Sequence, residues 1–238
     1  MSFYVDVHCH LTHKDFAHDY DQVITRAKQS NMGAIVVNGL EPKSNRKILE
    51  LAEKEEIIKA ALGIYPIDAV NEILPQDLPF TVEKFNVFEE IAFIEEQIKL
   101  GKLSAIGECG LDGYWLNSET FPKQEQVFSE LLKLGKLYEL PVIIHSRKLE
   151  KRTIEMVEDH KNEKIIFHCF SGKTNLAIKT AEKHGWCFSI PATASKNQGF
   201  TKLIEKLPME SLLTETDSPY LSPEKNTRNE PSNVLYTV

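Results

Sequence analysis

The chain has 238 residues, and 28 Lys and Arg against 35 Asp and Glu give it a formal net charge of -7. Its 42% hydrophobic and 26% charged content is that of an ordinary folded protein and excludes a disordered, collagen-like or coiled-coil chain. Every apolar run is shorter than the roughly 20 residues that a membrane span needs. The N-terminal MSFYVDVHCH lacks the basic and apolar regions of a signal peptide, so we expect a cytoplasmic protein.

Short, partly β-branched apolar runs alternate with segments of helical period. We expect strands at residues 3–7, 33–38, 57–64, 103–107, 141–144, 164–167, 186–190 and 212–214. The helical segments are residues 21–30, 44–55, 87–100, 122–140, 148–160, 174–184 and 199–207. Because strict alternation implies parallel strands joined by right-handed crossovers, residues 1–238 are expected to form one α/β domain, a (β/α)8 TIM barrel. An open doubly wound sheet is the alternative.

Two segments depart from this regular pattern. Residues 66–85 contain Pro66, Pro75 and Pro79, and we expect them to form a lid or side wall over the third strand. Asn229, Glu230 and Pro231 predict an N-cap and first turn of a helix, but the sequence stops at Val238. We therefore expect the eighth helix to be mostly missing, and the apolar surface left uncovered to favour self-association.

Side chains that commonly bind metals close or follow five of the expected strands. His8 and His10 close the first strand, and both imidazoles face one side because residues i and i+2 of a strand do so. The fourth, fifth, sixth and eighth strands are followed by Glu108, His145, His168 and Asp217. In a barrel these positions all lie at the C-terminal mouth, where active sites of this fold are built.

Six such ligands exceed the three that one catalytic ion takes from a protein. Two ions about 3.5–4 Å apart that share a carboxylate use all six and leave room for a bridging water. We therefore predict two divalent metal ions (Mg, Mn or Zn) and a binuclear hydrolase. In the alternative, core histidines without a metal, Glu108 and Asp217 would be buried at high cost without a cation.

Five ordered segments resemble the signature blocks of the TatD family of metal-dependent deoxyribonucleases, in the amidohydrolase superfamily. These segments are DVHCHL (6–11), IGECGLD (106–112), IIHSR (143–147), HCFSG (168–172) and TDSPYL (216–221). The resemblance implies a barrel that hydrolyses DNA phosphodiesters, in several members as a 3′–5′ exonuclease. By position, it gives one ion the two first-strand histidines and Asp217, gives the other His145 and His168, and makes Glu108 the bridge.

Two aromatic positions bear on substrate binding. Gly63-Ile64-Tyr65-Pro66 stands where many family members have Gly-x-His-Pro, so Tyr65 is expected to contact phosphate as a neutral donor. Beyond the fourth strand, Tyr114 and Trp115 are candidates for stacking on nucleobases, a contact worth about 1–3 kcal/mol. The alternative is that these two rings only cover their own loop and have a structural role.

The expected mouth loops are basic although the chain is acidic. Arg147, two residues beyond His145, points into the mouth by strand parity and is the expected phosphate clamp. The later mouth loops add Lys173, as a substrate contact, and Lys196, Lys225 and Arg228. This pattern attracts an anionic substrate to one face, whereas the net charge argues against a tight grip on duplex DNA.

These observations predict a cytoplasmic nuclease that acts on single-stranded or frayed DNA ends. Asp217 is expected to accept or steer the proton of the attacking water, with Glu108 and Arg147 as the other catalytic residues. The alternatives are a small-molecule amidohydrolase or lactonase, since this barrel carries many chemistries, and a non-catalytic metal-binding scaffold.

Three cysteines, Cys9, Cys109 and Cys169, directly follow an expected ligand. The alternation of a strand turns their thiols away from the barrel interior and toward the helices. We expect them to be small buried hydrophobic residues and not metal ligands.

Overall fold

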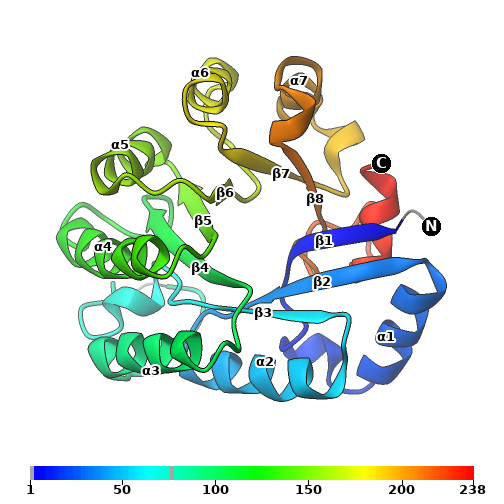
Figure 1. Cartoon of the computed structure of the whole chain (residues 1–238), viewed down its shortest axis with the longest axis horizontal. Helices are drawn as coiled ribbons and strands as arrows, with labels where there is room; N and C mark the ends of the chain where they lie inside the picture. The colour runs from blue at the N-terminus through cyan, green and yellow to red at the C-terminus, as the bar shows by residue number, and fades with distance from the viewer. Residues whose placement is uncertain (1–2, 76–77) are drawn as a thin grey trace.

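The computed structural model describes residues 3–75 and 78–238. Eight parallel strands run in sequential order around a barrel, with helices on its outside (Figure 1). The strands are β1 (Tyr4–Cys9), β2 (Met32–Asn38), β3 (Ile58–Leu62), β4 (Ala105–Asp112), β5 (Val142–Arg147), β6 (Ile165–Phe167), β7 (Cys187–Pro191) and β8 (Leu212–Glu215). The helices are α1 (Tyr20–Gln29), α2 (Pro42–Lys54), α3 (Val87–Lys99), α4 (Phe121–Leu137), α5 (Glu150–His160), α6 (Thr174–His184) and α7 (Gln198–Lys206). The predicted (β/α)8 barrel is confirmed.

Local chemistry sets the helix boundaries. The Glu41 side chain accepts hydrogen bonds from the backbone at the start of α2, Ser44 completes a capping box, and Pro42 occupies the first turn. Helix α5 begins at Glu150 and not at Lys148, the start that the sequence predicted. Lys148 has a φ of 65°, which lies in the left-handed region and cannot continue a right-handed helix.

Strands β1, β4 and β5 extend further toward the mouth than the apolar runs predicted. In the ladder between β4 and β5, Gly110 pairs with His145 and Asp112 pairs with Arg147. The hydrogen bonds of a sheet join backbone groups. A strand can therefore continue through a polar residue as long as the adjacent strand pairs with it. As a result, Glu108 and His145 lie within strands, whereas the sequence placed them after strand ends.

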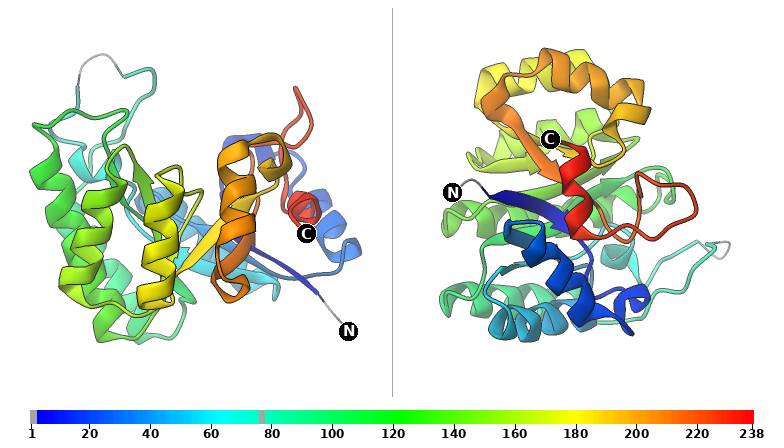
Figure 2. Two further views of the ribbon diagram at one scale, coloured as in Figure 1. Left: turned by 90° about the horizontal axis from the view of Figure 1, so that it is seen from above. Right: turned by 90° about the vertical axis from the view of Figure 1, so that its right-hand side faces the viewer.

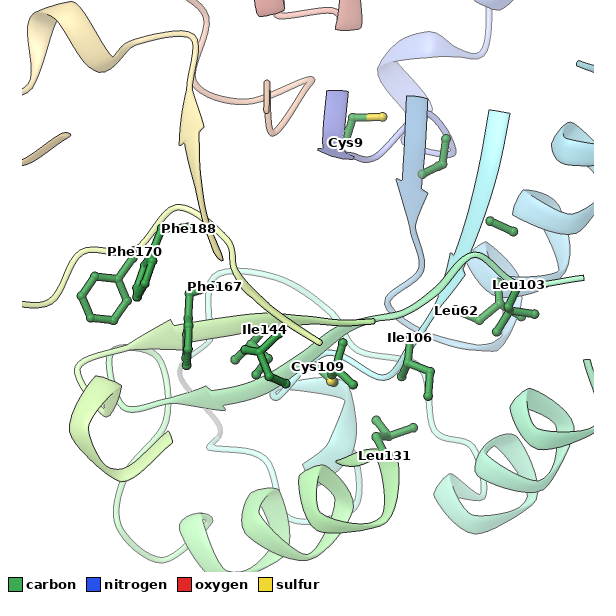
Figure 3. Packing of buried hydrophobic residues seen from close by; sticks show 14 of the residues in the cluster. Cys9, Leu62, Leu103, Ile106, Cys109, Leu131, Ile144, Phe167, Phe170 and Phe188 are labelled. Carbon is green, nitrogen blue, oxygen red and sulfur yellow. The ribbon is translucent and has the colours of Figure 1, made fainter. Parts of the chain in front are cut away.

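The hydrophobic core fills the space between the sheet and the surrounding helices. Phe167 and Phe188 stack with ring centroids 5.4 Å apart, and Figure 3 shows them together near the ends of their strands. Cys9 and Cys109 lie in the same core with no exposed surface, as predicted (Figure 3). Cys169 is half-buried and packs against it. Strand alternation therefore separates the thiols of Cys9 and Cys109 from their neighbouring ligands, whereas Cys169 lies after the end of β6 with a φ of 45°.

The barrel closes between β8 and β1 around the loop that follows β8. The Asp217 N–H donates to the His8 carbonyl at 2.9 Å, and the His10 N–H donates to the Ser218 carbonyl at 2.7 Å. The hydroxyl of Thr214 donates to the backbone of β1 at 2.6 Å. These bonds fix the first and last strands against each other at the mouth.

A 3-10 helix, η5 (Pro231–Tyr236), occupies the position of an eighth helix and packs against β1 and α1 (Figure 2, right). Its Val234 is fully buried. The N-cap position belongs to Glu230, and the predicted cap Asn229 is instead buried, donating from its amide to the Thr216 carbonyl. All eight residues of β4 are buried, whereas three of the four in β8 are half-buried. Self-association through this side stays a prediction.

The proline-containing insert forms a wall beside the loop that follows β4. Ile67 and Val70, next to the short 3-10 helix η2 (Asp68–Val70), make a small apolar cluster with Leu116. Residues 76–77 of the insert lie outside the described residues. Among the helices in the described parts of the chain, none combines the length and apolar character needed to cross a membrane.

Candidate metal centre

β1 and the loop after β8 form one side of the mouth. The Nε2 atoms of His8 and His10 lie 3.2 Å apart. The Oδ1 atom of Asp217 lies 3.6 Å from the first of these nitrogens and 3.4 Å from the second. Asp217 has a φ of 56°, a left-handed conformation that aspartate tolerates better than most residues. The three ring and carboxylate atoms therefore face one small volume.

Glu108 of β4 connects this side to the other. Its Oε2 atom lies 3.4 Å from Nε2 of His8 and 3.5 Å from Nε2 of His10. Its Oε1 atom lies 2.9 Å from Nδ1 of His145 and 3.2 Å from Nε2 of His168. Only 3% of the Glu108 side chain is exposed. One buried carboxylate thus presents one oxygen to each histidine pair.

Two glycines let the neighbouring strands approach Glu108 this closely. A Cβ atom at Gly63 of the β3 end would lie 2.5 Å from the Glu108 carbonyl oxygen. At Gly110, where φ is 143°, a Cβ would lie 2.0 Å from the carbonyl oxygen of His145. Any side chain at either position would push the strands apart, so glycine is required there.

The electrostatics of the cluster favour positive charge at its centre. Burial alone would raise the pKa of Glu108, but the charge of His168 and hydrogen bonds from His145 and His168 hold it well below its usual range. Burial opposes protonation of His168, yet Glu108 and Glu215 raise its pKa well above the usual value. The pKa of His8 is lowered by burial and by the charge of His168. A cation bound between these groups would be stabilised by the same carboxylates.

The donor set fits divalent metal ions. His8, His10 and Glu108 have ligand atoms within 4.8 Å of one another, and so have Glu108, His145 and His168. Among the described residues, the ion-pair partners of Glu108 and Asp217 are histidines, with no Lys or Arg. Imidazole and carboxylate donors are those that zinc and manganese prefer. The six predicted ligands are therefore brought together.

Two buried carboxylates of the site were missed from the sequence. Asp112 Oδ2 lies 2.9 Å from Nε2 of His145, and Glu215 Oε2 lies 3.4 Å from Nδ1 of His168. Strand alternation was the available signal: Asp112 is four residues after Glu108, and Glu215 two before Asp217, so each shares a strand face with an expected ligand. Both back a histidine from the side away from Glu108.

Comparison with known proteins identifies the family. Residues 5–238 match the model of the family described as TatD related DNase. The chain belongs to the TatD family. It is 34% identical over 234 residues to the human deoxyribonuclease TATDN3, covering 97% of this chain and 83% of that protein. It is 35% identical over 237 residues to an uncharacterized metal-dependent hydrolase from Methanocaldococcus jannaschii, covering 99% of this chain and 86% of that protein.

Solved structures give the same result. The TatD homolog YJJV from Escherichia coli K12 superposes on the chain with a TM-score of 0.83 at 29% sequence identity, covering 98% of this chain and 87% of that one. The chain is therefore a metal-dependent hydrolase of the TatD family, as its sequence blocks predicted.

Beside the predicted metal ligands of this TatD barrel lie the aromatic and basic residues expected to contact substrate. The Tyr65 ring contacts the edge of His145 with centroids 4.9 Å apart. Burial and the charge of Glu108 raise the pKa of Tyr65 well above its usual value, so the phenol stays neutral. The Arg147 guanidinium lies 3.7 Å from the ring centroid of Tyr114, a cation–π contact.

The remaining predicted contacts differ in how accessible they are. Tyr114 is 51% exposed, whereas Trp115 is half-buried against the insert, with its ring centroid 5.4 Å from that of Phe80. Lys173 is exposed at the start of α6. Lys196 and Arg228 are held within the protein, by the Pro223 carbonyl and by Asp19. Lys225 is exposed. Of these basic residues, Arg228 pairs with an acid, so its charge is offset, whereas the carbonyl that contacts Lys196 is neutral.

Proposed function

We propose that this chain is a deoxyribonuclease that hydrolyses phosphodiester bonds at single-stranded or frayed DNA ends, as a 3′–5′ exonuclease. The observation that carries the proposal is the position of Glu108, which directs one oxygen toward each histidine pair. The name of the human relative, a deoxyribonuclease, supports the choice of DNA. We assign this activity to residues 1–238 acting as one domain.

The proposed cofactors are two divalent ions, Mg, Mn or Zn. His8, His10 and Asp217 would hold one ion, His145 and His168 the other, and Glu108 would contact both. When bound, such ions lower the pKa of water and stabilise negative charge on a phosphodiester.

Asp217 is the proposed proton acceptor. At 16% exposure its side chain is the most open of the six, so it can reach a water molecule that enters from the mouth. Burial would raise its pKa, but the hydrogen bond to His10 and the nearby histidine charges lower it. The group is therefore a carboxylate at neutral pH and can accept or steer the proton of the attacking water.

Arg147, Tyr65 and Lys173 are proposed to bind the phosphates. The Arg147 guanidinium lies over the Tyr114 ring, and its N–H groups are proposed to donate to phosphate oxygens. Tyr65 adds a neutral hydroxyl donor beside His145, and Lys173 adds a charge at the rim. These donors stabilise the charge that develops at phosphorus.

Base stacking supports a single-stranded substrate. The exposed ring of Tyr114, with Trp115 behind it, offers a surface on which any unpaired base can stack. A chain of net charge -7 gains little from a long duplex, because duplex affinity depends on neutralising many phosphates. The free cysteines fit the reducing cytoplasm as the proposed location.

A nuclease assay with defined ends tests the proposal. Purified chain would be incubated with Mg2+, Mn2+ or Zn2+ and with 5′-labelled single strands, 3′-frayed duplexes and blunt duplexes. We expect single strands to be shortened stepwise from the 3′ end, faster than blunt duplexes, and no cleavage in EDTA. Matched variants are Glu108→Gln, expected to be inactive, and Glu89→Gln on the outer surface of α3, expected to be fully active.

Two outcomes would contradict the proposal. Metal binding without cleavage of any oligonucleotide, but with hydrolysis of lactones or amides, would favour a small-molecule amidohydrolase. Metal binding without hydrolysis of either substrate class would favour a scaffold.

A further inference from the structure

Asp112, at the end of β4, uses its two carboxylate oxygens for two different purposes. The residue has no exposed surface. Its Oδ2 atom accepts from Nε2 of His145 at 2.9 Å. Its Oδ1 atom accepts from the backbone N–H groups of Tyr114 at 2.8 Å and of Trp115 at 2.7 Å. One buried carboxylate therefore contacts both a proposed metal ligand and the loop at the mouth.

The first contact determines which nitrogen of His145 is available to a metal. The ring has Glu108 Oε1 2.9 Å from Nδ1 and Asp112 Oδ2 2.9 Å from Nε2. A carboxylate that accepts the Nε2–H leaves the Nδ1 lone pair free on the Glu108 side. Such a carboxylate also fixes the ring plane and makes the imidazole a stronger ligand.

The second contact shapes the loop. Both N–H groups converge on one oxygen, so the turn that carries Tyr114 is tied to the end of β4. Gln124 of α4 fixes the Asp112 backbone, accepting from its N–H at 2.8 Å and donating to its carbonyl at 3.1 Å. The Tyr114 ring, held in this way, is the surface on which Arg147 lies.

The ligands on the β1 side lack this arrangement. Nδ1 of His10 lies 3.2 Å from the Asn38 carbonyl oxygen, a neutral acceptor. Nδ1 of His8 is buried and has no hydrogen-bond partner in residues 3–75 and 78–238. His145 therefore contacts a carboxylate that also holds a mouth loop, whereas neither histidine of β1 has such a contact.

We propose that Asp112 is a positioning residue that couples the metal ligand His145 to the loop carrying Tyr114 and, through it, to Arg147. The coupling rests on the proposed function only in that His145 is a metal ligand. It predicts that one change at Asp112 weakens one of the two ion positions and leaves the other intact. It also predicts that the loop and the ion position can be disturbed separately.

Two substitutions separate the two contacts. Asp112→Asn keeps an oxygen for the Tyr114 and Trp115 N–H groups but places an amide N–H against His145 Nε2. That donor favours the tautomer with its proton on Nδ1, where the metal would bind. Asp112→Ala removes both contacts, and Asp21→Asn, on the exposed surface of α1, is the matched control.

Zn2+ would be titrated into the metal-stripped chain, with bound Zn2+ counted and amide hydrogen exchange measured residue by residue. For Asp112→Asn we expect two ions per chain to become one tight and one weak, about 10–100-fold weaker than in the parent. Protection of the Tyr114 and Trp115 amides should persist in Asp112→Asn and be lost in Asp112→Ala. Asp21→Asn should match the parent in both measurements.

Three results would overturn the coupling. Parent-like Zn2+ affinity at both positions in Asp112→Asn would remove the role toward His145. Unchanged amide protection in Asp112→Ala would remove the role in the loop. Loss of both ions in Asp112→Asn, with a lower unfolding temperature of its metal-free form, would show a merely structural residue. A parent chain that binds no Zn2+ would overturn the metal assignment itself, which is a separate failure.

Discussion

The two sides of the metal centre are built differently. On the β4–β5 side, the register shifts between Ile106 and Cys109, and the strands then pair without interruption as far as Asp112 and Arg147. Every residue of β4 is buried. On the β8–β1 side, a few bonds around Asp217 and the Thr214 hydroxyl hold the strands together, and a six-residue 3-10 helix covers them. One side is thus rigid by sheet pairing, and the other depends on chain segments that fold back onto it.

Because the two sides are built differently, we expect substitutions on one side to affect catalysis and substitutions on the other to affect folding stability. The ladder side carries Arg147 and Tyr114, so changes there should affect substrate turnover more than unfolding. The β8–β1 side, called the seam from here on, is held together by ion pairs of Arg26 with Glu230 and of Arg228 with Asp19. Changes at the seam should affect unfolding first, and metal content only through it.

The largest effect is expected where the two sides meet. Glu108→Ala removes the carboxylate that contacts both histidine pairs, so hydrolysis should fall by at least about 10³-fold and bound metal should fall to one ion or none. Metal analysis of the purified variant and a single-strand nuclease assay measure this. Unchanged metal content and activity would disprove a shared bridging carboxylate.

On the ladder side alone, Arg147→Ala should lower kcat/KM by roughly 10–100-fold, because a charge-assisted phosphate contact is worth about 1.5–3 kcal/mol. Metal content should stay at the parent value. Arg147→Lys should recover only part of the loss, since lysine lacks the planar fork.

Salt titration is the second measurement: binding of single strands should weaken from low to physiological salt. Loss of the ions in Arg147→Ala would instead make this arginine structural.

The seam side can be reinforced. Extending the chain by an amphipathic helix designed to cover β8, three residues of which are half-buried, should raise the thermal midpoint by about 2–4 °C per kcal/mol gained. Sedimentation should show whether the original chain pairs with itself and the extended one does not. A monomer whose midpoint does not change on extension would show that further cover adds little.

The smallest effect concerns the ion pairs of the seam. Burial would raise the pKa of Glu230, but hydrogen bonds from Arg26 and Ser232 lower it below its ordinary 4.5. A carboxylate with a lowered pKa adds stability above its unfolded value and loses it as pH falls through its folded value. Glu230→Gln should therefore cost about 1 kcal/mol at pH 7, and the cost should shrink below about pH 4.5. Urea unfolding across pH 3–7 measures it; a cost independent of pH would contradict the ion-pair account.

The sequence predicted the barrel and the six clustered residues because each ligand ends an apolar run. Hydrophobic pattern alone placed His145 and Glu108 at one mouth. It did not single out Asp112 or Glu215. Alternation could have shown that each shares a face with an expected ligand, but which imidazole each approaches depends on the distance between strands. For the same reason the sequence counted Arg228 among the basic residues of the mouth loops, although Asp19, far away in the chain, accepts a hydrogen bond from it.

The register of the strands also determines whether imidazole and carboxylate groups or thiol groups face the candidate metal centre. His8, Glu108 and His168 are each followed directly by a cysteine. A shift of one residue in β1 or β4 would exchange the His8 imidazole or the Glu108 carboxylate for a thiol. Thiol ligands would give a softer centre that selects other metals. Burial raises the pKa of the Cys9 thiol well above its usual value, which keeps it protonated and unreactive. The pairing of backbone groups, and not only the composition of the motifs, thus determines which side chains face the candidate metal centre.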